Sequence, residues 1–160
     1  DIMQWLLGEV DTVTSYAGIH NHHIDTEDLT ASIIKFKSGS VATFVSTTCA
    51  YPGISTDIQL YGTGGSVEID GDRLKLWKLT DADEFEEEEM LEKYGGGNGS
   101  PSADPAKVRG HAYQVHDMID AVYYDRDPVI SPREAIKSVA IVNAVYESAR
   151  TGKPVVPKSI

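Results

Sequence analysis

Two stretches of this 160-residue chain contain residue types that could do chemistry. The run GTGGS at residues 62–66 is of the glycine-rich kind that cradles phosphate groups. The run HNHH at residues 20–23 precedes the carboxylates Asp25, Glu27 and Asp28. Imidazole nitrogens and carboxylate oxygens bind metal ions and move protons, so this stretch is a candidate for metal binding or proton transfer. What either stretch can do depends on the elements that position it.

The glycine-rich run lacks the context of a nucleotide site. A dinucleotide fingerprint needs a strand, a glycine-rich turn and then a helix whose N-terminus meets the pyrophosphate. Here GTGGS is followed by VEID, which alternates as a strand does, and neither G-x-G-x-x-G nor a Walker Lys-Ser/Thr pair occurs in it. We therefore predict a tight turn at Gly62–Gly65 and no cofactor-binding residues in this chain.

The histidine run leaves three interpretations open. On an extended segment His20 and His22 would share one side, as a metal pair does, but no zinc-type spacing accompanies them. The second interpretation, polar residues at a strand end, is the one we favour over a metal site. In the third, one histidine faces a substrate, and on that basis His22 is assigned to a substrate pocket.

Two further residues are candidates for the same pocket. Tyr51, in Tyr51-Pro52-Gly53, follows a predicted strand, and His111 begins a predicted helix after a long loop. A plain turn and a solvent-facing histidine are the respective alternatives. Cys49 is expected to be a small buried residue rather than a nucleophile. No spacing defines a Ser/His/Asp or Cys/His arrangement, so no catalytic residue is predicted.

Hydrophobic patterning predicts an α+β fold with an open, mostly antiparallel sheet of about six strands and helices packed on one face. The expected strands are Val10–His20, Leu29–Phe36, Val41–Ala50, Asp57–Tyr61, Ser66–Asp70 and Arg73–Leu79. The expected helices are the end of one at Asp1–Gly8, His111–Tyr124, and Ser131–Arg150 with a capping box and Pro132 at its first position. The pattern of Asp1–Gly8 is typical of the last turns of a helix whose beginning is missing. We therefore expect the chain to be a fragment.

Residues 81–110 are expected to be a mobile loop. Eight acids fall within Asp81–Glu92, and a run rich in Gly, Ser and Pro follows. The net charge of −11 argues against a nucleic-acid-binding surface. No apolar run is long enough for a membrane span, and the single cysteine fits a reducing cytoplasm.

Both faces of Val41–Ala50 carry apolar or small residues. Two helices can cover only one face of a sheet, so the other face is expected to pack on a second copy of the chain.

The order of these elements resembles a known family. The segments DIMQWLLG, EDLTASIIKFKSGSVATFVSTTCAYPG, DIQLYGTGGSVEIDGDRLKLW and HAYQVHDMIDAVYYDRDPVISPREAIKSVAIVNAVYESARTGKPV together resemble the C-terminal domain of the Gfo/Idh/MocA oxidoreductases, the glucose-fructose oxidoreductase and inositol dehydrogenase group. The resemblance covers nearly the whole chain, 1–160, apart from residues 81–110.

The resemblance implies a two-part enzyme. An N-terminal Rossmann domain, absent here, would bind NAD or NADP, and hydride would pass between the nicotinamide and a sugar, polyol or related compound. Asp1 matches the last Asp of the family's catalytic stretch, so the catalytic His would lie three residues before it. The resemblance further implies that Tyr51 and His111 match regions approaching the substrate, and that the open sheet packs against another subunit.

On this interpretation the chain is the substrate and oligomerisation domain, inactive alone. The alternative is a binding or assembly module that kept the fold without redox activity. Some relatives resemble glycosidases that use the nicotinamide as a redox helper, which is a third interpretation.

Overall fold

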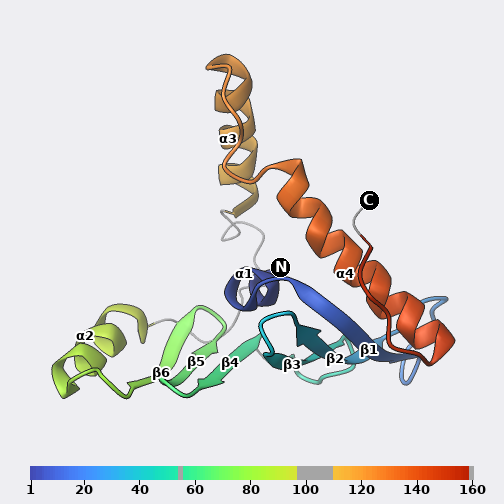
Figure 1. Cartoon of the computed structure of the whole chain (residues 1–160), viewed down its shortest axis with the longest axis horizontal. Helices are drawn as coiled ribbons and strands as arrows, with labels where there is room; N and C mark the ends of the chain where they lie inside the picture. Colours follow the sequence, from blue (N-terminus) through green and yellow to red (C-terminus); the bar gives the residue numbers. More distant parts are fainter. Residues whose placement is uncertain (54–55, 97–109, 159–160) are drawn as a thin grey trace. The chain divides into compact units, whose positions relative to one another are not determined.

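The computed structural model describes residues 1–53, 56–96 and 110–158 (Figure 1). The chain divides into two compact units, one formed by Asp1–Ala50 with Gly110–Ile160 and the other by Tyr51–Arg109. The elements of the first unit are α1 (Ile2–Leu7), β1 (Val10–Gly18), β2 (Leu29–Phe36), β3 (Val41–Thr47), α3 (Gly110–Tyr123) and α4 (Pro132–Thr151). Those of the second unit are β4 (Asp57–Gly62), β5 (Gly65–Asp70), β6 (Arg73–Leu79) and α2 (Glu84–Tyr94).

The first unit is built on an antiparallel sheet in the order β1-β2-β3. The turn between β2 and β3 is closed by hydrogen bonds from Phe36 N to Ser40 O and from Gly39 N to Phe36 O, both 2.9 Å long. Gly39 adopts a φ of 92°, which a residue with a side chain rarely adopts. This turn fixes the register, which pairs Leu29 with Thr47 at the far end of the hairpin.

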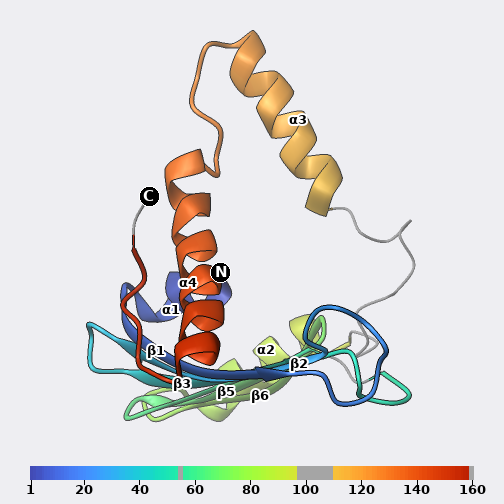
Figure 2. The same cartoon turned by 90° about the vertical axis from the view of Figure 1, so that its right-hand side faces the viewer.

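Helix α4 packs along β1 on one face of this sheet (Figure 2). The side chains of Val13 in β1 and Ile34 in β2 are fully buried between this helix and the sheet. Burying each side chain contributes about 1.5–3 kcal/mol to folding. The buried cluster around them consists of Val10, Val13, Ile34, Phe36, Ala144 and Val145.

The start of α4 confirms the predicted N-terminal cap. Ser131 Oγ accepts a hydrogen bond from Glu134 N at 3.3 Å, and Pro132 occupies the first turn. Gly152 ends the helix in the left-handed conformation, with φ 66°.

The other face of the β1-β2-β3 sheet carries exposed apolar side chains. Because side chains alternate along a strand, residues adjacent to Val13 and Ile34 point away from α4. On that face Tyr16, Ile33, Val41 and Val45 are 55%, 51%, 61% and 64% exposed. The apolar stripe of α3 is exposed as well: Val115, Met118, Ile119 and Val122 keep about half or more of their surface.

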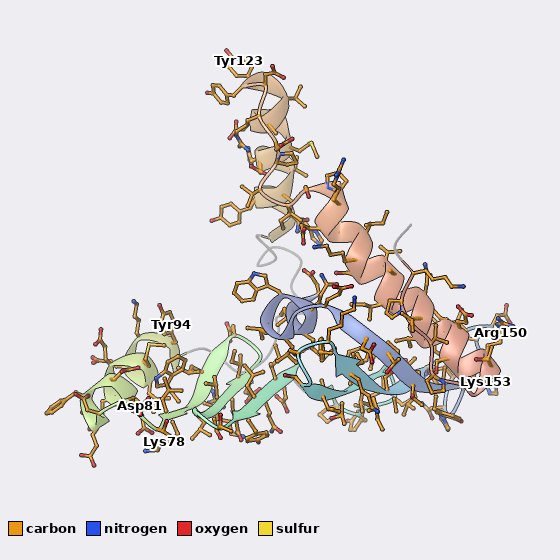
Figure 3. All side chains as sticks on the ribbon, in the orientation of Figure 1. Lys78, Asp81, Tyr94, Tyr123, Arg150 and Lys153 are labelled. Carbon is orange, nitrogen blue, oxygen red and sulfur yellow. The ribbon has the colours of Figure 1, made fainter. Side chains whose placement is uncertain are left out.

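The second unit is a separate antiparallel sheet, in the order β4-β5-β6, with α2 packed on β6. In Figure 3, Lys78 and Asp81 lie beside the turn from β6 into α2, and Tyr94 lies at the end of that helix. The α+β class, the six strands and their antiparallel pairing are thus confirmed, and the strands form two three-stranded sheets.

The prediction of an irregular loop at residues 81–110 is wrong for α2. Asp83 caps this helix by accepting a hydrogen bond from Glu86 N at 2.9 Å, and acids in the first turn interact favourably with the helix dipole. Lys78 pairs with Glu87, and Trp77 Nε1 donates to Glu86 Oε1 at 3.3 Å, so β6 supplies partners for the charged side chains. The rest of the prediction, at residues 97–109, lies outside the described residues.

Within the described ranges, none of the helices combines the length and apolar character that crossing a membrane demands.

Candidate functional site

Asp28 organises the loop that joins β1 to β2. Its carboxylate is fully buried and accepts three backbone hydrogen bonds, from His20 N to Oδ1 and from Asn21 N and His22 N to Oδ2, at 2.8, 2.8 and 2.9 Å. These donors, the His22 amide foremost, hold the pKa of Asp28 far below its usual range, although burial acts in the opposite direction. The loop therefore bends around a carboxylate whose ionised form these amides stabilise.

The ring of His22 lies on the same carboxylate. Its Nδ1 is 3.2 Å from Asp28 Oδ2, and its side chain is 40% exposed. Because an ionised carboxylate can only accept, Nδ1 carries a proton in this arrangement. Asp28 thus fixes the orientation of the imidazole, as a carboxylate partner does for histidines in catalytic and metal sites.

The end of β3 joins the same residue through its backbone carbonyl. Asp28 O accepts hydrogen bonds from Thr47 Oγ1 at 2.9 Å and from Thr48 N at 3.0 Å. Cys49 N donates to Thr47 Oγ1 at 3.0 Å, which places Cys49 Sγ 3.7 Å from Asp28 O and 3.9 Å from His22 Nδ1. Cys49 is half-buried rather than buried as expected, because it lies just beyond the strand.

Donor atoms of three different types therefore meet in one place. One atom each from His22, Asp28 and Cys49 lies within 4.8 Å of the other two. We call these three residues the His22 cluster. An imidazole, a carboxylate and a thiol are the groups that could hold a metal ion here.

A small cavity of about 270 Å³ adjoins the cluster. Tyr146 of α4 donates a hydrogen bond to Glu27 Oε1 at 2.6 Å in its wall, and this acceptor raises the pKa of Tyr146. The wall combines hydroxyl, carboxylate and aromatic groups, a surface that can receive a small polar ligand. It is formed by Glu27, Asp28, Thr30, Phe44, Ser46, Thr47, Thr48, Val142, Val145 and Tyr146.

A larger hollow of about 680 Å³ lies beside α1. Its wall includes Asp1, whose Oδ1 accepts a hydrogen bond from Ser138 Oγ at 2.9 Å, together with Trp5, Glu134 and Lys137. Trp5 is 82% exposed. Charged and aromatic side chains therefore meet beside the first residue of the chain.

The three residues predicted for a substrate pocket have different surroundings. His22 belongs to the cluster around Asp28, while Tyr51 is 94% exposed and belongs to the second unit. His111 is exposed in the first turn of α3. No interaction among the described residues joins these three, so the assignment of Tyr51 and His111 stays a prediction.

The side-by-side pairing of His20 and His22 expected on an extended segment is not found. His20 Nε2 faces Tyr16 Oη at 3.4 Å, whereas the His22 ring faces Asp28. The hydrogen bonds to Asp28 bend the segment, so the two rings turn to different partners. The tertiary partner Cys49 was missed because it lies 27 residues further along the chain.

The glycine-rich run forms the predicted turn. Gly62 pairs with Gly65 at the end of the β4–β5 hairpin, and a strand follows. Gly65 has a φ of 145°, and a Cβ there would lie 2.2 Å from Lys78 O of β6. The glycine is thus required for strand packing, and this turn does not fit the pyrophosphate of a dinucleotide.

The family model for the C-terminal α/β domain of the oxidoreductase family GFO_IDH_MocA matches residues 1–156. The chain therefore belongs to this family, as its resemblance indicates. A comparison with curated protein sequences finds no match.

Similar solved structures contain NAD or NADH. The WlbA dehydrogenase from Bordetella pertussis, in complex with NADH and UDP-GlcNAcA, is 23% identical with a TM-score of 0.77, and the match covers 99% of this chain and 45% of that one. Levoglucosan dehydrogenase, in complex with NADH and levoglucosan, is 20% identical with a TM-score of 0.69, and the match covers 99% of this chain and 48% of that one. GenD2 from gentamicin A biosynthesis, in complex with NAD, is 22% identical with a TM-score of 0.69, and the match covers 97% of this chain and 44% of that one. At these identities the likeness shows the fold, and the chain spans less than half the length of each of these structures.

Proposed function

We propose that this chain is the substrate and oligomerisation domain of an NAD(P)-dependent oxidoreductase that transfers hydride to or from a sugar, polyol or related compound. The observation that carries the proposal is the family match over residues 1–156. Structures of the same fold bind NADH together with UDP-GlcNAcA or levoglucosan, which supports a carbohydrate-like substrate.

In this proposal, this chain contacts the substrate, and a Rossmann domain of the full-length parent binds the cofactor. That domain would bind NAD or NADP, which supplies the hydride chemistry. The glycine turn at Gly62–Gly65 is occupied by strand packing, so this chain is proposed to have no cofactor site and no activity alone. A cytoplasmic location is part of the proposal and rests on the single cysteine.

The hollow beside Asp1 is the proposed place where the substrate binds. The family resemblance implies that the catalytic histidine would lie three residues before Asp1, and on that basis we propose that this hollow opens close to the reacting centre. Lys137 and Glu134 in its wall can bind substrate hydroxyl groups, and Trp5 offers an aromatic face. His22, Tyr51 and His111 remain proposed substrate contacts.

The experiment compares the full-length parent with the 160-residue chain. NADH formation would be followed with a panel of sugars, polyols and nucleotide sugars, and NAD and NADP would be titrated into each protein by calorimetry. We expect activity and saturable binding for the parent and neither for the chain. Saturable NAD(P) binding by the chain alone, or a parent without redox activity on any member of the panel, would contradict the proposal.

The alternative, an assembly module without redox activity, would use an exposed apolar face of the first unit. The open face of the β1-β2-β3 sheet exposes Tyr16, Ile33, Val41 and Val45, an apolar surface suited to association. Both functions need this face, but only the module predicts that the parent associates while lacking hydride transfer. The activity measurement above distinguishes the two.

A further inference from the structure

The His22 cluster has a chemical composition that folding alone does not explain. Asp28 needs only backbone amides to shape its loop, and it has three. Yet an imidazole and the only thiol of the chain are also brought to it, from two different strand ends. We propose that His22, Asp28 and Cys49 form a binding site for a divalent transition metal ion of the zinc type, a role that goes beyond the proposed oxidoreductase function.

The distances between the donor atoms fit such an ion. In a tetrahedral zinc site with bonds of about 2.0–2.3 Å, ligand atoms lie about 3.3–3.6 Å apart. His22 Nδ1 is 3.2 Å from Asp28 Oδ2 and 3.9 Å from Cys49 Sγ, and all three atoms lie within 4.8 Å of one another. Cys49 lies beyond the last residue of β3, so rotation of its side chain can close the remaining gap.

The surroundings of Asp28 suit a ligand. Oδ1 accepts one amide and Oδ2 accepts two, and these bonds hold the carboxylate in place as outer partners do in metal sites. The metal would replace the contact between Oδ2 and the proton on His22 Nδ1, and the thiolate form of Cys49 would give up its contact with Asp28 O. The loop therefore keeps its amide hydrogen bonds when the metal binds.

Charge and protons balance at this site. On binding, the imidazole proton moves from Nδ1 to Nε2 on the partly exposed ring, and the Cys49 thiol releases one proton to solvent. The carboxylate and the thiolate then carry two negative charges, which neutralise one divalent cation. A neutral group is the form that a partly buried site stabilises best.

The donor set selects the class of metal. Thiolate and imidazole favour Zn²⁺ and similar ions over Mg²⁺ and Ca²⁺, which prefer oxygen ligands. Three protein ligands leave a fourth position for water, and the 40% exposure of the His22 side chain lets solvent reach it. The site is therefore of the open type.

Cobalt is a direct probe, because Co²⁺ bonded to a thiolate gives a charge-transfer absorption band. Cys49 is the only cysteine, so in this chain the band can arise only from it. Co²⁺ would be titrated into the reduced 160-residue chain, followed by displacement with Zn²⁺. We expect the band at one ion per chain, its loss on adding Zn²⁺, and about one proton released per ion.

Two variants and a matched control complete the test. Cys49→Ser should abolish the band, and His22→Gln should weaken Zn²⁺ binding at least about tenfold. His23→Gln removes an exposed histidine from the same loop and should leave the affinity unchanged. Circular dichroism of each variant checks that it folds. The absence of the band, a stoichiometry of half an ion per chain, or equal Zn²⁺ affinity in folded Cys49→Ser would overturn the proposal.

Discussion

Ser148 Oγ lies 3.0 Å from the backbone nitrogen of Ser15, although 133 residues separate them in the sequence. The hydroxyl accepts from this strand amide and donates to Lys153 O at 2.7 Å. Ser148 is completely buried, so α4, β1 and the segment after α4 meet at one hydroxyl group that water does not reach.

Replacing Ser148 should therefore destabilise the first unit. Ser148→Ala leaves a strand amide and a carbonyl without their partner, and we expect a loss of about 1–3 kcal/mol in the free energy of unfolding. Urea denaturation measures it. Thr151→Ala, on the exposed last turn of the same helix, is the control and should change stability by less than about 0.5 kcal/mol. Equal effects of the two substitutions would contradict this role of Ser148.

The Asp117 carboxylate should give the first unit a pH-dependent stability. It accepts hydrogen bonds from Arg126 Nη2 at 2.8 Å and Val129 N at 2.7 Å, and the Arg126 interaction foremost lowers its pKa. A carboxyl whose pKa is lower in the folded state stabilises that state above its unfolded pKa, near 4, and this contribution disappears as the pH falls below that value.

The comparison uses two Asp-to-Asn variants on α3. Asp117→Asn should be less stable than the unmodified chain at pH 7, with a difference that shrinks as the pH falls below about 4. Asp120→Asn, at an exposed position of the same helix, should follow the unmodified chain throughout. Thermal unfolding at a series of pH values decides, and a difference for Asp117→Asn that is independent of pH would count against the prediction.

Gly65 tests the interpretation of the glycine-rich run as a structural turn. In Gly65→Ala the new methyl group would meet Lys78 O, and the φ of 145° is strained for alanine. We expect a loss of stability of more than about 1 kcal/mol. Gly64→Ala is the control, because nothing lies within 4 Å of its Cβ position. Unfolding followed through Trp77 fluorescence, in a Trp5→Phe background that removes the other tryptophan, should separate the two. A tolerated Gly65→Ala would refute the packing argument.

Most of the fold could be predicted from the sequence, because the local signals for strands and helix caps agree with the pattern of buried residues in the structure. The predicted bounds of β2, Leu29–Phe36, and the predicted cap and Pro132 at the start of α4 each reappear in the structure. Helix α2 was missed because its acidic run, together with the run rich in Gly, Ser and Pro after it, was taken as the composition of a mobile loop. Its signal was present in the cap at Asp83 and in the helix-favouring glutamates that follow.

The candidate site could be predicted only in part. His22 was singled out by residue type, but its partners depend on tertiary structure. The hairpin turn sets the register that brings Asp28 opposite the end of β3, so counting outward from Lys37–Ser40 could have placed Asp28 near Cys49. The bend of residues 20–22 around Asp28 has no such local signal, because it depends on backbone amides that every sequence has.

The last prediction concerns association through the open face of the β1-β2-β3 sheet. Tyr16, Ile33, Val41 and Val45 expose more than half of their surface there. Two such sheets packed face to face, about 10 Å apart, would remove these side chains from water in a twofold arrangement. The net charge of −11 opposes association only weakly at physiological salt, where charges are screened beyond about 8 Å.

Light scattering at micromolar concentration should accordingly give a mass about twice the 17.4 kDa of one chain. Val45→Lys should yield monomers, because association would bury an unpaired ammonium group against an apolar face. The added lysine makes the net charge less negative, so greater overall repulsion cannot explain the change. Val129→Lys makes the same change in charge at a side chain that is 84% exposed and lies outside the sheet, and this variant should remain dimeric. A monomeric unmodified chain, or a dimer that persists in Val45→Lys, would show that this face is not the interface.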